Sequence, residues 1–139
     1  MIYLLDIGTL TQLIAHQPPE LASRVDALAE NDCLGMSFVT WAQLLEGAER
    51  SARRAEVVRR LEALAWQVPV RQPAAAAVAR HYAEQSVRLG DAGVRFATND
   101  LWVACHALAE EAILVTPDTA RFAAVAGLRL DNWCAAPAR

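Results

Sequence analysis

Lysine is absent from this chain, and all 13 of its basic residues are arginine. With 16 acidic residues, the net charge at pH 7 is −3, which argues against nucleic-acid binding through bulk positive charge. Cysteine is scarce as well: the three cysteines, at positions 33, 105 and 134, include no C-x-x-C pair. This odd and scattered set argues against a disulfide framework or a zinc site, and it favours a reducing, cytoplasmic location.

Long apolar runs are also missing. Charged residues interrupt every stretch that approaches the roughly 20 apolar residues of a membrane span, so we expect no membrane association. No basic residue precedes the apolar start of the chain and no cleavage-site pattern follows it, so we interpret this start as a strand and not as a signal peptide. Hydrophobic residues make up 55 % of the 139 residues. This composition excludes disorder and predicts a single domain over residues 1–139.

Short apolar runs alternate with segments of helical periodicity along the whole chain. Strands are predicted over residues 2–5, 33–39, 66–70, 112–116 and 128–130, and helices over 10–30 with a break at the two prolines, from 40, over 53–65 and 73–89, from 100, and over 118–126. Thr40 and the Thr98-Asn99 pair are expected to cap the helices that they precede. Such alternation predicts an α/β fold, in which helices cover both faces of a parallel sheet.

Three aspartates lie at the tips of these predicted elements. Asp6 ends the first strand, Asp100 opens a helix, and Asp118 follows the fourth strand. Ligands of parallel sheets bind beyond the carboxyl ends of the strands. Carboxylates gathered there would suit a hard divalent cation such as Mg²⁺, which activates water and neutralises charge on a phosphodiester. The alternative is that each aspartate only caps a helix or lies in a solvated loop.

The residues around these aspartates resemble a known family. The segments in question are YLLD at 3–6, VTWAQLLEGA at 39–48, NDLWVACHAL at 99–108, LVTPD at 114–118 and FAAVAGL at 122–128. In this order they resemble the successive motifs of PIN-domain ribonucleases, and above all those of the VapC toxins of bacterial type II toxin–antitoxin (VapBC) systems. The resemblance extends over essentially the whole chain, and its specificity comes from the motifs taken together.

The resemblance implies a three-layer α/β/α fold with a central parallel sheet of about five strands. It also implies an acidic cleft that holds Mg²⁺ or Mn²⁺, cleavage of RNA, homodimers, and inhibition by a VapB-like antitoxin that inserts a basic side chain into the cleft. Asp6, Asp100 and Asp118 match acidic positions of the family and are the expected metal ligands. Asn99 matches the polar residue before the third acid, and Thr116 matches the hydroxyl residue at the end of the fourth strand.

The chain departs from the family at two places. It has Asp6-Ile7-Gly8 where the family usually has Asp-Thr-Asn, and Gln43 stands at the position of the second acid. A glutamine offers a carbonyl oxygen, but it has no charge and cannot act as a base. The lost charge should weaken both metal binding and transition-state stabilisation. Glu46, three residues further along the helix, is a candidate substitute.

Gln43 leaves three interpretations open: a degenerate toxin, an inactivating substitution introduced for expression, or a working variant site. Two functions follow. The first is a metal-dependent endoribonuclease in which Asp6, Gln43, Asp100 and Asp118 form the site. The second is a catalytically silent PIN domain that binds antitoxin or RNA. A nucleotide-binding domain is disfavoured, because no glycine-rich phosphate loop follows any predicted strand.

Other conspicuous residues allow a functional and a structural interpretation. Arg50, Arg53 and Arg54 belong to an arginine-rich helical segment, which could form a rim facing RNA or antitoxin, or only a solvated helix of alternating charge. His106 lacks a second ligand at helical spacing, so we expect a hydrogen-bonded core residue. The four tryptophans are expected to pack in the core or at a dimer seam.

Overall fold

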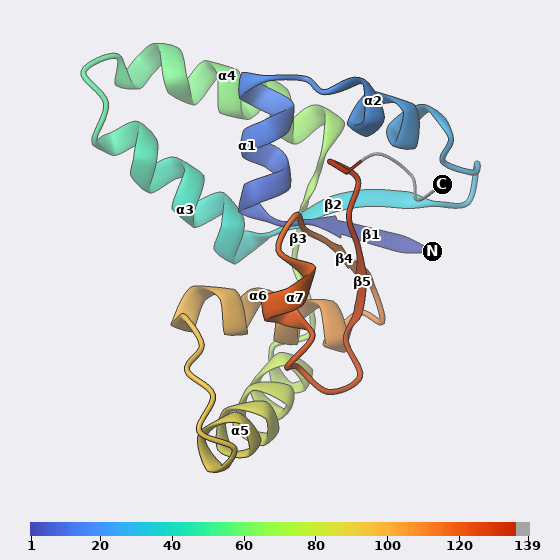
Figure 1. Ribbon diagram of the computed structural model, residues 1–139. Coiled ribbons are helices and arrows are strands. Elements are labelled where there is room, and N and C mark those ends of the chain that lie inside the picture. The colour runs from blue at the N-terminus through green and yellow to red at the C-terminus, as the bar shows by residue number, and fades with distance from the viewer. Residues whose placement is uncertain (136–139) are drawn as a thin grey trace.

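Five short strands form one sheet in the order β3-β2-β1-β4-β5, and every neighbouring pair is parallel (Figure 1). The structure, a computed structural model, describes residues 1–135, so the last four residues of the predicted domain lie outside it. The elements in chain order are β1 (Ile2–Leu5), α1 (Ile7–Ala15), α2 (Pro19–Asp26), β2 (Cys33–Ser37), α3 (Phe38–Glu49), α4 (Arg54–Gln67), β3 (Val70–Arg71), α5 (Ala75–Asp91), α6 (Thr98–Ala109), β4 (Ile113–Val115), α7 (Thr119–Phe122) and β5 (Arg129–Asp131).

Neighbouring residues on β1 enter different hydrophobic cores, because successive side chains of a strand point to opposite faces of the sheet. Leu4 packs in a cluster with residues of α5, α6 and α7, whereas Leu5 packs in a second cluster with residues of α1, α2 and α4. Both leucines are fully buried. Figure 1 shows α1 to α4 on one side of the sheet and α5 to α7 on the other. The predicted three-layer α/β/α arrangement is confirmed.

The carboxyl ends of the central strands place polar residues at one edge of the sheet. Asp6 follows β1, Ser37 ends β2, and Thr116 follows β4. The register pairs Leu5 with Val115, and the backbone N–H of Asp6 donates to the carbonyl of Val115 at 3.0 Å. The first and fourth strands therefore end side by side, as the prediction for Asp6 requires.

Two predicted boundaries are wrong. The second strand ends at Ser37 and not at residue 39, because the Ser37 hydroxyl caps α3 by accepting the N–H of Val39 at 3.2 Å. Thr40 lies inside the first turn of that helix and does not cap it. The third strand is confined to Val70–Arg71, since α4 continues through Gln67. Helix α4 ends at Gln67 because the next residue, Val68, precedes Pro69, and the residue before a proline is disfavoured in a helix.

Smaller differences concern other element ends. Helix α2 ends at Asp26, short of the predicted residue 30, and α6 begins at Thr98 without a side-chain cap. The tryptophans only partly follow the packing prediction: Trp133 is buried, whereas Trp66 is 89 % exposed on α4. Within residues 1–135, no helix combines the length and apolar character that a membrane crossing needs.

Candidate active site

Asp6 is a buried carboxylate that also begins a helix. It is 7 % exposed and caps α1, with its Oδ1 accepting the backbone N–H of Thr9 at 2.8 Å. The Thr9 hydroxyl donates to the carbonyl of Val115 at 2.9 Å, which ties the start of α1 to β4. Burial raises the pKa of Asp6, and the charge of Asp100 adds to this, while hydrogen bonds from Thr116 and Thr9 oppose it. Asp6 and Asp100 are thus close enough to interact electrostatically.

Asp100 and Asp118 are joined by one arginine. Nη1 of Arg121 lies 2.7 Å from Oδ2 of Asp100, and its Nε lies 2.9 Å from Oδ2 of Asp118. Asp100 belongs to the first turn of α6, whereas Asp118 and Arg121 come from the start of α7. The guanidinium also lies over the rings of Phe122 and Phe96, 5.1 and 6.0 Å from their centroids. The structure therefore brings together acids that are distant in the sequence, with a cation between two of them.

The turn that carries Asp118 is organised by Thr116. This residue is fully buried, and its hydroxyl oxygen accepts the backbone N–H of Asp118 at 3.0 Å. Pro117, the residue between them, packs close to Gly8, where an added Cβ would lie 3.1 Å from the proline ring. The small residue at position 8 thus makes room for this proline. Asn99, the other supporting residue of the prediction, lies exposed in the first turn of α6.

This geometry can be compared with known proteins. The family model described as PIN domain matches residues 3–128 of the chain. Ribonuclease VapC1 of Haemophilus influenzae is 36 % identical over 133 residues, which cover 96 % of this chain and 98 % of the relative. The chain belongs to the PIN-domain family, in its VapC branch. The resemblance found in the sequence motifs is confirmed.

Solved structures agree with this assignment. VapBC-1 from nontypeable Haemophilus influenzae has a chain that superimposes on this PIN domain with a TM-score of 0.92 at 36 % identity, covering 96 % of this chain and 98 % of that one. VapBC2 from Rickettsia felis, solved bound to a DNA fragment from its promoter, gives a TM-score of 0.89 at 28 % identity and covers 96 % of this chain and 99 % of that one.

Gln43 and Glu46, both on α3 of this PIN domain, differ in their exposure to solvent. Gln43 is partly buried, whereas Glu46 is 70 % exposed and its carboxylate lies 3.6 Å from Nη2 of Arg50 on the surface. This placement lends no support to the hypothesis that Glu46 replaces the missing acid. One turn before Gln43, the buried hydroxyl of Thr40 has no hydrogen-bond partner among residues 1–135. The sequence predicted a helix cap at Thr40, and this buried hydroxyl was missed as a feature near the site.

The acids fit a hard divalent cation by their chemistry, because carboxylate oxygens are the ligands that such an ion prefers. The guanidinium of Arg121 already acts as a monovalent stand-in between two of them. With that arginine in place, the described part of the chain contains no group of three His, Cys, Asp or Glu side chains that could hold a metal. The donor type therefore fits such an ion, while in this structure two of the acids are paired with Arg121.

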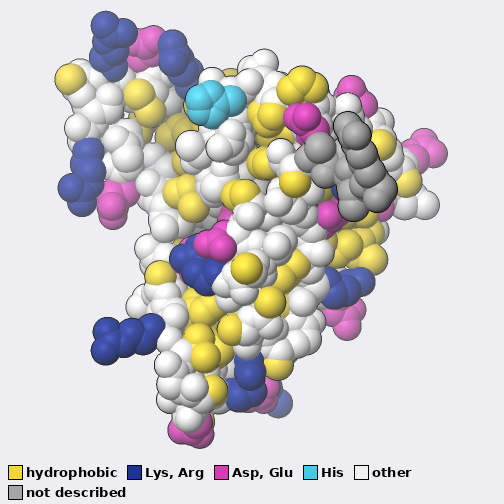
Figure 2. Space-filling view, viewed as in Figure 1, with side chains coloured by type: hydrophobic (Ala, Val, Ile, Leu, Met, Phe, Trp, Pro, Cys, Tyr) yellow, Lys and Arg dark blue, Asp and Glu magenta, His cyan; other side chains and the backbone are white. Residues whose placement is uncertain are grey.

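The predicted arginine rim lies where α3 meets α4. Arg50 pairs with Glu46, Arg53 with Glu56 at 3.9 Å, and Arg54 with Glu49 at 2.6 Å, all between partly or fully exposed side chains. Figure 2 shows arginine and acidic side chains mixed over this end of the molecule. Exposed pairs contribute little stability, so these arginines can exchange their partners for phosphate or carboxylate groups at low cost.

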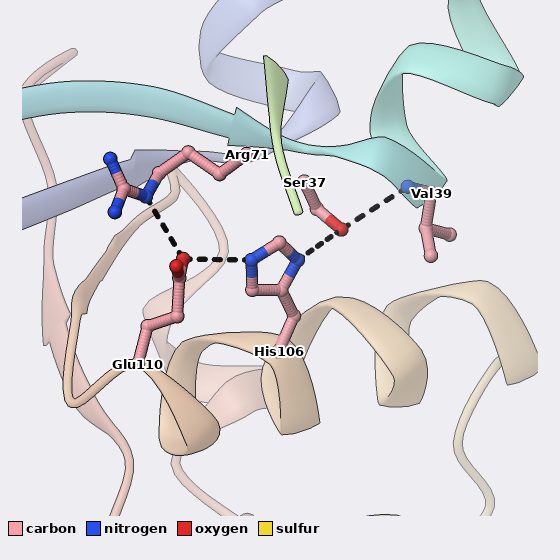
Figure 3. A network of polar contacts seen from close by, with 5 residues as sticks. All are labelled: Ser37, Val39, Arg71, His106 and Glu110. Atoms are coloured by element: carbon pink, nitrogen blue, oxygen red, sulfur yellow. Dashed lines mark hydrogen bonds and ion pairs between the residues drawn. The ribbon is translucent and has the colours of Figure 1, made fainter. Parts of the chain in front are cut away.

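A buried polar network lies at the other end of α6 (Figure 3). Nδ1 of His106 is 2.8 Å from the Ser37 hydroxyl, and its Nε2 is 2.8 Å from Oε2 of Glu110, which also accepts from Nε of Arg71 at 3.0 Å. Burial lowers the pKa of His106, which makes the neutral ring the stable form. Glu110 then accepts from Nε2–H, and Ser37 donates to Nδ1.

The predicted core role of His106 is confirmed, while Ser37, Arg71 and Glu110 were missed by the sequence analysis. Ser37, His106 and Glu110 are hydrogen-bonded in the same order as the serine, histidine and acid of a hydrolytic triad, but the resemblance goes no further. Ser37 and His106 are both fully buried, and the serine oxygen also caps α3. A nucleophile must reach its substrate, so this network is structural.

Proposed function

We propose that this PIN domain is a VapC-type toxin that cleaves RNA phosphodiester bonds in a divalent-metal-dependent reaction. The observation that carries the proposal is that Asp6 follows β1 at the carboxyl edge of the parallel sheet and interacts electrostatically with Asp100, which Arg121 joins to Asp118. Membership of the VapC branch supports the same activity. The single predicted domain over residues 1–139 stays part of this proposal.

Asp6, Asp100 and Asp118 would hold the ion, Mg²⁺ or Mn²⁺, since both prefer oxygen ligands. The chemistry gained with such an ion is charge neutralisation on the phosphodiester and activation of water. The chain's own residues position the acids. Thr9 donates its N–H to Asp6, and Thr116 holds the backbone of Asp118. Asn99, one residue before Asp100 in the exposed first turn of α6, stays a proposed supporting residue of the site.

Gln43 is the residue on which the rate depends. It takes the place of an acid on α3, and the structure offers Glu46 no contact that would compensate for the lost charge. We therefore expect weakened cleavage. The second candidate function, a silent PIN domain that binds antitoxin or RNA without cutting, is favoured by this same residue together with the pairing of Asp100 and Asp118 to Arg121.

A VapB-like antitoxin is the proposed inhibitor, because the two solved relatives are VapBC assemblies. The rim of Arg50, Arg53 and Arg54 would face either this antitoxin or RNA through arginine–carboxylate or arginine–phosphate contacts. The proposed location is the cytoplasm, where RNA and antitoxin are available. The proposed assembly is a homodimer.

Cleavage of structured RNA by purified, antitoxin-free protein tests the proposal. Transfer and ribosomal RNA are incubated with the protein and Mg²⁺, and then with EDTA. Asp100→Asn is expected to lower the rate by about 10²–10³-fold, the range for losing one electrostatic group of an active site. This variant also exposes a contaminating nuclease, whose cutting would persist unchanged.

Gln43→Glu separates the two candidate functions. If the scaffold is intact and only the second acid is missing, restoring the charge increases cleavage by about tenfold or more. Folded Gln43→Glu protein that does not cut, with an equally inactive parent, would support the silent binding module instead. Circular dichroism of each variant confirms that the loss of cutting is not a loss of fold.

A further inference from the structure

Arg121 forms ion pairs with two of the acids that the proposed reaction needs. It forms two charged contacts of 2.7 and 2.9 Å, one with Asp100 in the first turn of α6 and one with Asp118, which directly precedes α7. The pairing with Asp118 spans three residues within one short segment, but Asp100 lies on α6, 21 positions before the arginine. A simple helical surface pair would need only the first of these contacts.

The arginine is also supported from behind. Its guanidinium lies over the ring of Phe122 at 5.1 Å and over that of Phe96 at 6.0 Å, distances at which an aromatic face attracts a cation. These two rings pack edge to face, with centroids 5.5 Å apart. Phe122 is buried in the core between the sheet and α6. The aromatic pair therefore restricts the positions that the guanidinium takes up.

The third acid is left without a cation. Among the described residues, Asp6 forms no ion pair, although it is almost fully buried and interacts with the charge of Asp100. A planar guanidinium spans two carboxylates well, but it carries a single charge. A divalent ion brings twice that charge and draws oxygen ligands from several sides. The arginine and a metal ion thus need the same oxygens of Asp100 and Asp118.

We propose that Arg121 is a built-in competitor of the metal ion: its guanidinium holds Asp100 and Asp118 in the metal-free protein and must leave them before a divalent cation binds. This inference rests on the proposed function, because it takes Asp6, Asp100 and Asp118 as the metal site. It adds a regulatory element to that site. The metal affinity of this chain is set by the exchange of an internal cation for an external one, and not by the acids alone.

Calorimetric titration of the purified chain with Mn²⁺ tests the exchange without relying on cleavage. Arg121→Gln is expected to tighten Mn²⁺ binding by about tenfold, a value reduced from the full Coulomb interaction because the arginine is 42 % exposed. Arg60→Gln is the matched control. It removes the same charge from an ion pair of 2.9 Å with Glu56 on α4, and should leave the affinity within about twofold.

Two further arms keep the test decisive. Arg121→Lys keeps the charge but loses the fork that reaches both acids, so its affinity should lie between those of the parent and Arg121→Gln. In Arg121→Gly, millimolar guanidinium chloride should weaken Mn²⁺ binding again, whereas sodium chloride at equal ionic strength should not. The thermal unfolding midpoint of each variant without metal reports whether it folds.

The outcomes distinguish this inference from the proposed function. Asp100→Asn that loses Mn²⁺ binding, together with an unchanged affinity in Arg121→Gln, would leave the metal site standing and overturn the role of Arg121. Tight Mn²⁺ binding that survives Asp100→Asn would place the metal elsewhere and overturn the site. Folded Arg121→Gln and parent proteins that both fail to bind Mn²⁺ would overturn the inference as well.

Discussion

A carboxylate lies at each end of α6, Asp100 in its first turn and Glu110 directly after its last residue, and the two differ in their surroundings. At the carboxyl-terminal end, Glu110 is bonded to both His106 and Arg71, and its histidine partner is bonded in turn to Ser37. At the amino-terminal end, Asp100 shares Arg121 with Asp118, while Asp6 forms no ion pair within residues 1–135. The first, closed cluster is largely buried, whereas the second, open cluster reaches solvent at Arg121 and Asp118.

The difference shows how one helix serves both stability and function. A largely buried network, in which both ring nitrogens of His106 have partners, favours a single packing of α6 against β2, β3 and the start of α3. An acidic cluster with an incomplete set of cations instead stores repulsion and desolvation cost. That cost is tolerated where a ligand is to be bound.

His106→Ala should cause the largest loss of stability. It leaves a cavity and removes a partner from both Ser37 and Glu110, so we expect the free energy of unfolding to fall by about 3 kcal/mol. Urea denaturation measures this change. His81→Ala on α5, where the histidine is only half-buried, is the control and should cost much less. Similar losses in both variants would contradict the importance of the network.

Acid should destabilise the closed cluster. Burial lowers the pKa of His106 below its usual 6.5, so the unfolded chain takes up this proton first and the free energy of unfolding decreases as the pH falls below about 6.5. Burial acts to raise the pKa of Glu110, but its bonds to Arg71 and His106 lower it overall, which adds a further loss below about 4.5. In His106→Gln the first of these two decreases should disappear. A parent stability that stays flat down to pH 4.5 would count against the closed cluster.

Asp6→Asn should have a smaller effect, of opposite sign. The pKa of Asp6 is raised, so its contribution to stability is full below the usual 3.8 and is lost as the pH rises through the folded value. Asparagine keeps the cap of α1 without the charge. At neutral pH we expect the variant to be more stable by about 1 kcal/mol, while cleavage is lost. The gain should vanish in acid, and a destabilised variant at neutral pH would contradict the prediction.

Glu46→Gln should change almost nothing. The ion pair of Glu46 with Arg50 lies on the surface at 3.6 Å, so the stability should change by less than about 0.5 kcal/mol. Cleavage and Mn²⁺ affinity should stay within about twofold of the parent. A clear loss of either would restore Glu46 as the substitute for the missing acid and would extend the open cluster onto α3.

Much of the fold was predictable from local patterns. Leu4 and Leu5 are neighbours on a short apolar strand, so their side chains point to opposite faces of the sheet. Both faces therefore need helices to cover them. The predicted end of the first strand at Asp6 follows from the same run. The second strand was predicted too long because Phe38 and Val39 are apolar, and periodicity alone cannot separate a strand end from the first turn of a buried helix.

The candidate site was predictable as a set of acids, but not as a set of contacts. Asp100 and Asp118 are 18 positions apart, and nothing in their spacing announces that Arg121 joins them. Arg71 and Glu110 are separated by 39 positions, and only the pairing of β2 with β3 brings the arginine within reach of α6. The packing prediction for Trp66 was wrong, because this aromatic residue has apolar neighbours at core spacing but is exposed on α4.

The sequence by itself determined the alternation of strands and helices, the family, and the three aspartates at the ends of their elements. These follow from apolar periodicity and from short motifs, which act over a few residues. The tertiary structure decided which charges meet: Arg121 with the acids of the site, and Glu110 with His106 and Arg71. Ion pairs between distant elements depend on how helices pack on the sheet, because charged groups interact strongly only within a few ångströms.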